Sequence, residues 1–270
     1  MDAAARDSLA GLLAESRAAI AVDDTRTGPE RELVGELLDR IGDAGAVAPA
    51  EWLEAIAGSG RQAELADLVS VLARHLAPDD EPPSSGGDAQ VWRALVAVAE
   101  RLGGAAVEPL GRLPFVGDRL LDLLVRESRD QLPERPEAGR RIVGPAGRAL
   151  SSLAVSGKLR RAVAGALGFE VAPSYSALYE YDPPGSHVRT HLDRRDYELV
   201  VHVILEHDLP GDGSPGSALV VHRPGGAAPS RLHLRPGESV ALSGRGTIHS
   251  WEPLRGDERR TLVGIGFTRA

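Results

Sequence analysis

The sequence predicts an α+β fold in which a helical N-terminal part packs on a C-terminal jelly roll. Up to about residue 169, apolar residues recur at intervals of three and four, which is the period of an amphipathic helix. From about Val171 onward, short β-rich runs alternate with Gly and Pro, and eight such runs fit into about a hundred residues. That spacing is typical of a sandwich or double-sheet jelly roll, whose open mouth often holds a small-molecule or metal site.

The first predicted unit comprises residues 1–77 and is helical. The run from Thr27 to Glu30 resembles a capping box, which places a helix start before the apolar residues that follow it. Each apolar stripe needs a partner, so these helices are expected to pack on one another. The stripes run from Leu9 to Ile20, from Leu33 to Ile41, from Trp52 to Ile56 and from Leu65 to Leu76.

Residues 78–90 are predicted to form an exposed linker or mobile loop, because PDDEPPSSGGD is polar and rich in Pro, Gly and Ser. A second helical unit is expected over residues 91–169. Asp88 suits the cap of its first helix, and Gly103 and Gly104 suit its end. Further helices are predicted near 116–131 and 149–167.

Six basic residues lie in the second helical unit. They could form a phosphate-binding patch, but charges on amphipathic helices usually make up the solvated face, and that interpretation is favoured. The six are Arg140, Arg141, Arg148, Lys158, Arg160 and Arg161.

Composition restricts the chemistry further. The chain has 270 residues, of which 42% are hydrophobic and 26% charged, as expected for a protein that forms its own core. It has no cysteine, which excludes thiolate zinc sites and iron–sulfur clusters and leaves His, Asp and Glu as metal ligands. A net charge of −8 disfavours nucleic-acid partners. The acidic N-terminus and the lack of a long apolar run predict a cytoplasmic protein without membrane contact.

One short motif carries most of the chemical information. His191 and Asp193 are separated by one residue, and alternate residues of a strand point to the same side, so an imidazole and a carboxylate would project together. Two histidines and one carboxylate with open positions beside them form the facial triad that binds Fe(II). His249 is the best third ligand, and we predict one divalent metal on these three residues.

The eight β-rich runs are punctuated by turn sequences such as DPPG at 182–185 and the glycine-rich stretch 211–216. They give the strand predictions Ser174–Tyr181, His187–Asp193, Glu198–Leu205, Ala218–His222, Arg231–Leu234, Ser239–Leu242, Thr247–Trp251 and Thr261–Phe267.

The C-terminal part, residues 170–270, resembles the 2-oxoglutarate- and Fe(II)-dependent dioxygenases, and within them the prolyl-hydroxylase-like branch. The resemblance rests on Tyr181 ten residues before His191, on the His191-Leu-Asp193 pair, on His249, and on an arginine in GDERRTLVGIGF. It implies a double-stranded β-helix domain, with Fe(II), 2-oxoglutarate as co-substrate and O2. The implied reaction hydroxylates an unactivated C–H bond and yields succinate and CO2. Related halogenases vacate the carboxylate position, so Asp193 favours hydroxylation over halogenation.

The arginine that would bind 2-oxoglutarate is either Arg259, ten residues after His249, or Arg260, eleven after it. The resemblance and strand parity favour Arg259, because an inward Arg259 brings Thr261, Val263, Ile265 and Phe267 inward as an apolar wall. Thr261 and Tyr181 would then donate further hydrogen bonds to the co-substrate.

The same parity turns Arg189 toward the site, where a guanidinium suits a carboxylate-bearing substrate or a protein carboxylate. His187 shares this parity. The substrate would be an amino acid, a peptide or a small natural product. A jelly-roll sensor or cupin-like metal-binding protein that does not use 2-oxoglutarate is the alternative. The sequence does not indicate the oligomeric state.

Overall fold

The computed structural model describes residues 11, 14, 62–104, 107–132, 134–193, 198–211, 213–223 and 227–270. Of the three helices predicted before residue 62, only residues 11 and 14 fall within these ranges, and the rest lies outside them. Within them, no helix is long and apolar enough to cross a membrane.

A helical hairpin opens the described part of the chain. Helix α4 (Gln62–Leu76) carries the predicted apolar stripe, and Leu65, Leu68 and Leu72 are buried against α5 (Gly86–Gly103). Helix α5 ends where the two glycines predicted its end, but it begins at Gly86, inside the segment predicted as a linker. That segment is mostly exposed, but Asp80, Gly87 and Ala89 are buried. Asp80 is 2% exposed and has a left-handed φ of 63°.

Two antiparallel sheets follow, and all eight predicted strands have a counterpart in them. The larger sheet has the order β1-β8-β5-β10-β3-β2, and the smaller sheet has the order β4-β9-β6-β7. The strands are β1 (Val107–Arg112), β2 (Ile142–Pro145), β3 (Val171–Asp182), β4 (Val188–His191), β5 (Leu199–Asp208), β6 (Leu219–Val221), β7 (Ser230–Leu232), β8 (Glu238–Ser243), β9 (His249–Trp251) and β10 (Arg259–Arg269).

Strands β1 and β2 correct the prediction that residues 91–169 are helical throughout. They form the two edges of the larger sheet, β1 beside β8 and β2 beside β3. Both contain a proline, Pro109 and Pro145, which an edge strand tolerates because one side of it has no ladder to complete. Such short edge strands carry too little alternation to be recognised in a sequence.

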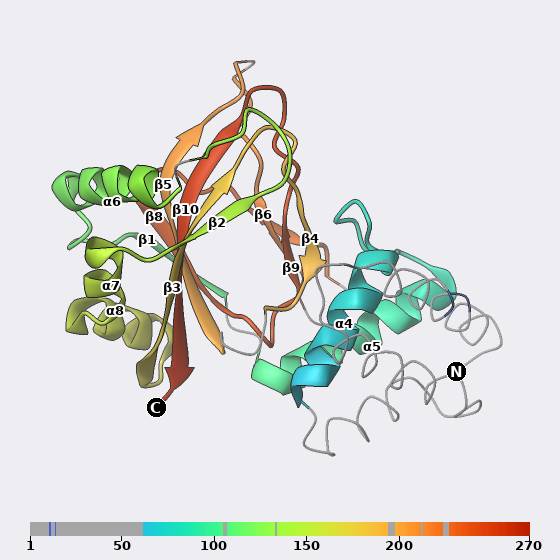
Figure 1. Ribbon diagram of the computed structural model, residues 1–270. Coiled ribbons are helices and arrows are strands. Elements are labelled where there is room, and N and C mark those ends of the chain that lie inside the picture. Colours follow the sequence, from blue (N-terminus) through green and yellow to red (C-terminus); the bar gives the residue numbers. More distant parts are fainter. Residues whose placement is uncertain are drawn as a thin grey trace.

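Three helices cover the outer face of the larger sheet (Figure 1). They are α6 (Asp118–Gln131), α7 (Arg148–Ala154) and α8 (Gly157–Leu167), so the helix predicted near 149–167 is in fact two. The break falls at Ser156, whose side chain accepts a hydrogen bond from the Leu159 amide and caps α8. Their apolar faces pack on the sheet residues Tyr179, Val263 and Ile265.

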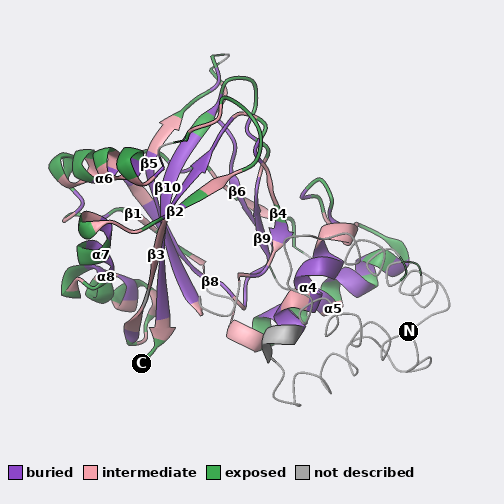
Figure 2. Cartoon of the chain, viewed as in Figure 1, coloured by how far each residue is buried: buried purple, intermediate pink, exposed green. Residues whose placement is uncertain are grey.

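The opposite face of the larger sheet looks toward the smaller sheet. Val200, Leu242 and Leu262 from the larger sheet share a core with Leu219 and Trp251 from the smaller one. Figure 2 shows that the facing strands are buried along much of their length, whereas the outer side of α6 is exposed. The α4–α5 hairpin covers the other side of the smaller sheet near β4 and β9 (Figure 1). The order of layers is therefore helices, larger sheet, smaller sheet and helical hairpin, consistent with the predicted α+β jelly roll.

Candidate metal centre

The structure brings the three predicted metal ligands together at the interior face of the smaller sheet. His191 ends β4, Asp193 follows it, and His249 begins β9. His191 and His249 are direct antiparallel partners in the ladder, and the Asp193 amide donates to the Gly244 carbonyl at 2.8 Å. One ligand atom from each of the three residues lies within 4.8 Å of the others.

Backbone carbonyl groups fix the orientation of both imidazoles. The Nδ1 of His191 is 2.9 Å from the Arg189 carbonyl oxygen, and the Nδ1 of His249 is 2.9 Å from the Thr247 carbonyl oxygen. A carbonyl oxygen only accepts, so both Nδ1 atoms carry a proton, and Nε2 is the nitrogen of each ring that is available for a metal. Histidines that bind metals are oriented in this way by their second nitrogen.

The distances fit a shared ion. Each Nε2 lies beside Asp193 Oδ1, at 3.6 Å for His191 and 3.7 Å for His249. These are too long for hydrogen bonds. Ligand atoms that each lie roughly 2.0–2.2 Å from one metal are at most about 4.4 Å apart, so both distances suit bridging by an ion. Asp193 Oδ2 is buried without a hydrogen-bond partner in the described part of the chain, as expected for an oxygen that needs a cation.

The charge states also favour metal binding. Burial, reinforced by the neighbouring His191, lowers the pKa of His249 to about 4, so its imidazole is neutral at pH 7. Burial alone would raise the pKa of Asp193, but His249 and His191 outweigh it and hold this pKa below its usual range. The site therefore presents the neutral imidazole of His249 and the carboxylate of Asp193 beside the Nε2 atom of His191, a donor set that matches a hard or borderline divalent cation.

Beyond the three ligands, the interior contains a histidine that the sequence did not single out. His202 on β5 is 5% exposed, and neither ring nitrogen has a hydrogen-bond partner within the described ranges. Burial lowers its pKa to about 3. Gly264 lies beside it, and a Cβ there would be in ordinary contact with the His202 ring at 3.9 Å but tight against Glu180 Oε1 at 3.3 Å.

An arginine pair lies in the same interior. Arg260 on β10 is 1% exposed, and its Nε and Nη2 donate to Asp182 Oδ2 at 3.1 and 2.8 Å. Its guanidinium stacks on the Trp251 ring, 3.9 Å from the ring centre. Arg141 binds the same carboxylate from the other side, with its Nε 2.5 Å from Asp182 Oδ1, and it also pairs with Glu180. Asp182 is thus held between two guanidinium groups.

One donor of this cluster is unused. Arg260 Nη1 is buried and has no hydrogen-bond partner in the described part of the chain. A buried guanidinium nitrogen without an acceptor is costly, and a ligand carboxylate would satisfy it. Arg260 therefore offers a binding point for an anion inside the jelly roll.

The predicted register of the last strand is wrong. Val263, Ile265 and Phe267 pack under the helices on the outer face, whereas Leu262 belongs to the core between the sheets. The apolar residues of β10 mark the helix-covered face, and the small Gly264 marks the interior, where bulky polar side chains need space. Arg260, and not Arg259, is on the interior side.

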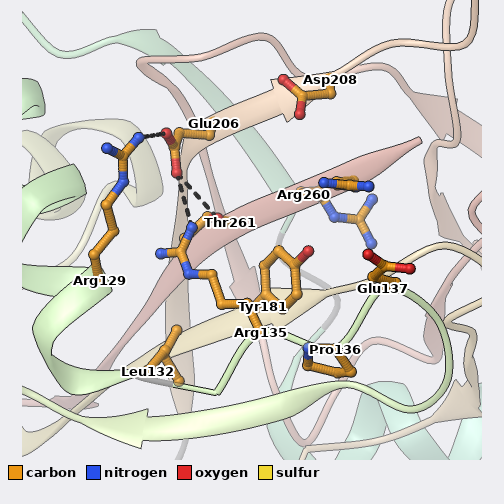
Figure 3. Close-up of a pocket in the computed structure, with 11 residues that line it drawn as sticks. Arg129, Leu132, Arg135, Pro136, Glu137, Tyr181, Glu206, Asp208, Arg260 and Thr261 are labelled. Atoms are coloured by element: carbon orange, nitrogen blue, oxygen red, sulfur yellow. Dashed lines mark hydrogen bonds and ion pairs between the residues drawn. The ribbon is translucent and has the colours of Figure 1, made fainter. Parts of the chain in front are cut away.

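Arg259, Thr261 and Tyr181 do come together, but on the outer face. They line a cavity of about 470 Å³ beside α6. Arg260 also borders this cavity, as does Arg135, which stacks on the Tyr181 ring at 5.1 Å (Figure 3). The predicted position of Arg259, Thr261 and Tyr181 beside the metal ligands is a consequence of the wrong register.

Arg189 is exposed, and its inward orientation stays a prediction, because a bulge interrupts the alternation on which it depends. Val188 pairs with Trp251 and His191 with His249, so four residues of β4 lie opposite three of β9. The extra residue places Val188 in the core and turns His187 toward Asp80, 3.1 Å away.

Sequence reasoning missed Arg141, Asp182, Glu180 and His202. The solvated-face interpretation holds for the other five basic residues of its group, which are exposed, but Arg141 precedes β2, where the sheet continues beside Asp182. The signal available in the sequence was the alternation of Glu180 and Asp182 with Tyr179 and Tyr181, which places two acids on one face of a strand.

No protein-family model matches the sequence, and no curated protein matches it. Similar solved structures include a 2OG-Fe(II) oxygenase-family oxidoreductase from Burkholderia pseudomallei (21% identity, 66% of this chain, 90% of that chain, TM-score 0.47). A Pseudomonas putida prolyl-4-hydroxylase is 20% identical over 65% of this chain and 98% of its own, with a TM-score of 0.44. HygX from Streptomyces hygroscopicus, with nickel and 2-oxoglutarate bound, is 12% identical over 63% of this chain and 85% of its own, with a TM-score of 0.47. These values concern the fold alone, and function is argued from the site.

Proposed function

We propose that this protein is an Fe(II)- and 2-oxoglutarate-dependent oxygenase that hydroxylates an unactivated C–H bond of an amino acid, a peptide or a small natural product. The observation that carries the proposal is that ligand atoms of two histidines and one aspartate lie within 4.8 Å of one another. Backbone carbonyl groups bind the Nδ1 atoms and so orient both imidazoles. This donor set is the facial triad of non-haem iron oxygenases.

His191, Asp193 and His249 would hold the metal on one side and leave its other positions open. When bound there, Fe(II) supplies the activation of O2 that couples oxidation of 2-oxoglutarate to hydroxylation of the substrate. The chain contributes the fixed ligand geometry and burial of His249, which is 1% exposed. Asp193 keeps its carboxylate, so we expect hydroxylation and no chlorinated product.

We assign the distal carboxylate of 2-oxoglutarate to Arg260. Support comes from its burial, its place on the interior face and its free Nη1. Asp182 holds the Nε edge of the guanidinium, which fixes the orientation in which Nη1 is presented.

The same contact favours a second candidate function, a metal-binding jelly roll that does not use 2-oxoglutarate. Asp182 already accepts hydrogen bonds from Nε and Nη2 of Arg260, and Trp251 covers the guanidinium. Only Nη1 is therefore left, within the described part of the chain, to bind a ligand carboxylate. The two functions differ in whether the metal-bound protein binds the dicarboxylate.

The test is an anaerobic calorimetric titration of the metal-free protein with Fe(II), followed by 2-oxoglutarate, and then succinate formation in air. We expect one metal per chain, 2-oxoglutarate binding only after the metal, and succinate production. His249→Ala should abolish metal binding. His233→Ala is the matched control, because the exposed side chain of His233 bonds to the Gly216 carbonyl, away from the three ligands. Metal binding without any response to 2-oxoglutarate would support the second function and contradict the first.

A further inference from the structure

The residues that alternate with the metal ligands point to the α4–α5 hairpin. Leu192, between His191 and Asp193, and Ile248, which precedes His249, are both buried in the apolar core of the hairpin. The hairpin lies against β4 and β9 (Figure 1). Its packing therefore bears directly on the backbone that carries all three ligands.

One hydroxyl of α4 holds the backbone between two ligands. Ser70 Oγ accepts a hydrogen bond from the Leu192 amide at 2.9 Å and donates to the Ala66 carbonyl at 2.8 Å. The Leu192 carbonyl lies 3.4 Å from the same hydroxyl, so Ser70 contacts both sides of this residue. Ser70 is 4% exposed, and water does not compete for these bonds. His191 and Asp193 flank Leu192, so this contact restrains the backbone between the two ligands.

A carboxylate after α4 holds the preceding residue. Thr190 Oγ1 lies 3.1 Å from Asp80 Oδ1 and 3.2 Å from the Ala77 carbonyl, and His187 Nε2 lies 3.1 Å from Asp80 Oδ2. Burial alone would raise the pKa of Asp80, but these partners and Ser250 on β9 lower it, so the carboxylate is ionised at neutral pH.

The backbone of Asp80 has an energetically unfavourable conformation. Its φ of 63° lies in the left-handed region, which a residue with a side chain occupies only at some energetic expense. Glycine would take this conformation more easily, but it would leave Thr190 and His187 without the carboxylate.

We propose that Ser70 and Asp80 are positioning residues that make the α4–α5 hairpin the platform of the metal centre. The proposal rests on metal binding by the site proposed above. It gives the described part of the helical region a role in the chemistry: the hairpin fixes the ligand-bearing strand from behind. Partners of metal ligands that lie one layer out commonly change metal affinity by roughly 10–100-fold when they are removed.

The decisive variant is Ser70→Ala, compared with Ser128→Ala. Ser128 on α6 is also fully buried, donates to a carbonyl of its own helix at 2.7 Å and accepts one N–H, from Arg135 at 2.8 Å. Each variant loses one bond donated to a helix carbonyl and one accepted N–H, which comes from a backbone amide for Ser70 and from a guanidinium for Ser128. Of the two serines, Ser70 contacts the ligand strand. We expect the metal affinity of Ser70→Ala to fall by about 10–100-fold and that of Ser128→Ala to stay within about twofold of wild type.

Two further measurements separate positioning from general stability. Hydrogen exchange of the Leu192 amide in the metal-free protein should accelerate in Ser70→Ala and remain unchanged in Ser128→Ala. Asp80→Gly relieves the left-handed backbone, so it should fold even where Ser70→Ala does not, yet it should still lose metal affinity. Asp80→Asn, which tolerates the same backbone and keeps an acceptor for Thr190, should retain more of it.

Wild-type metal affinity in both Ser70→Ala and Asp80→Gly would overturn the proposal. Failure of 2-oxoglutarate to bind the metal-loaded wild type would contradict the oxygenase function alone, because the metal affinities would still report on the hairpin.

Discussion

Replacing Arg260 by alanine tests the register of β10 and the co-substrate assignment together. The change removes two hydrogen bonds to Asp182, at 3.1 and 2.8 Å, and the stacking on Trp251. Breaking a buried ion pair costs about 3–5 kcal/mol when one charge is left alone. Here Arg141 still donates to Asp182 at 2.5 and 2.9 Å, so the carboxylate stays paired and we expect the lower value, about 3 kcal/mol. Domains of ordinary stability remain folded after such a loss.

The neighbouring residue supplies the control. Arg259 is exposed, so Arg259→Ala should change the free energy of unfolding, measured in urea, by less than about 0.5 kcal/mol. In calorimetric titrations of the metal-loaded protein, Arg260→Ala should weaken 2-oxoglutarate binding by about 10–100-fold, the value of one charged hydrogen bond of about 1.5–3 kcal/mol. Arg259→Ala should bind it as wild type does. Weakened binding in Arg259→Ala with normal binding in Arg260→Ala would refute the inward orientation of Arg260.

Two further predictions concern buried groups. Burial opposes ionisation of Glu258, but bonds from His207 and Ser217 outweigh it and lower its pKa from 4.5 to about 2, so the ionised carboxylate should stabilise the fold by about 3 kcal/mol at neutral pH. This contribution is complete above the unfolded pKa and is lost as pH falls toward the folded one. The stability difference between wild type and Glu258→Gln should therefore hold from pH 7 to about 5 and shrink to about 1 kcal/mol near pH 3 in urea titrations; a pH-independent difference would contradict it. Gly264→Ala places a methyl group 3.3 Å from Glu180 and should destabilise the fold by about 1–3 kcal/mol, and an unchanged melting temperature would argue against the tight interior.

The sequence was informative where a pattern depends on local geometry. Alternation along a strand has a period of two, so the eight C-terminal strands and the His191–Asp193 pair were accessible from composition and spacing alone. The third ligand, His249, required a topology that pairs β9 with β4, and a family resemblance supplied it.

Two features could not be predicted: which side of a strand faces the interior, and which short segments form the edge strands of the larger sheet. Both depend on what covers each sheet. Both faces of β10 are buried, one under helices and one against the other sheet, so parity gave two residue sets without deciding which set faces inward. The bulge in β4 interrupts the alternation from which the orientation of Arg189 was predicted, and the sequence composition does not indicate it. Arg141 reaches the interior because β2 joins the larger sheet beside Asp182, a contact between segments 41 residues apart.

The charged groups of the interior indicate that the proposed metal and dicarboxylate would favour each other's binding. Arg141 and Arg260 supply two positive charges, and Asp182 and Asp193, whose pKa values are both held low, supply two negative ones. Burial also raises the pKa of Glu180, which pairs with Arg141, and apart from this group the four charges balance. A divalent cation alone would add two positive charges to a buried space, and a dicarboxylate alone would add two negative ones. Bound together they preserve the balance, so each should strengthen the binding of the other.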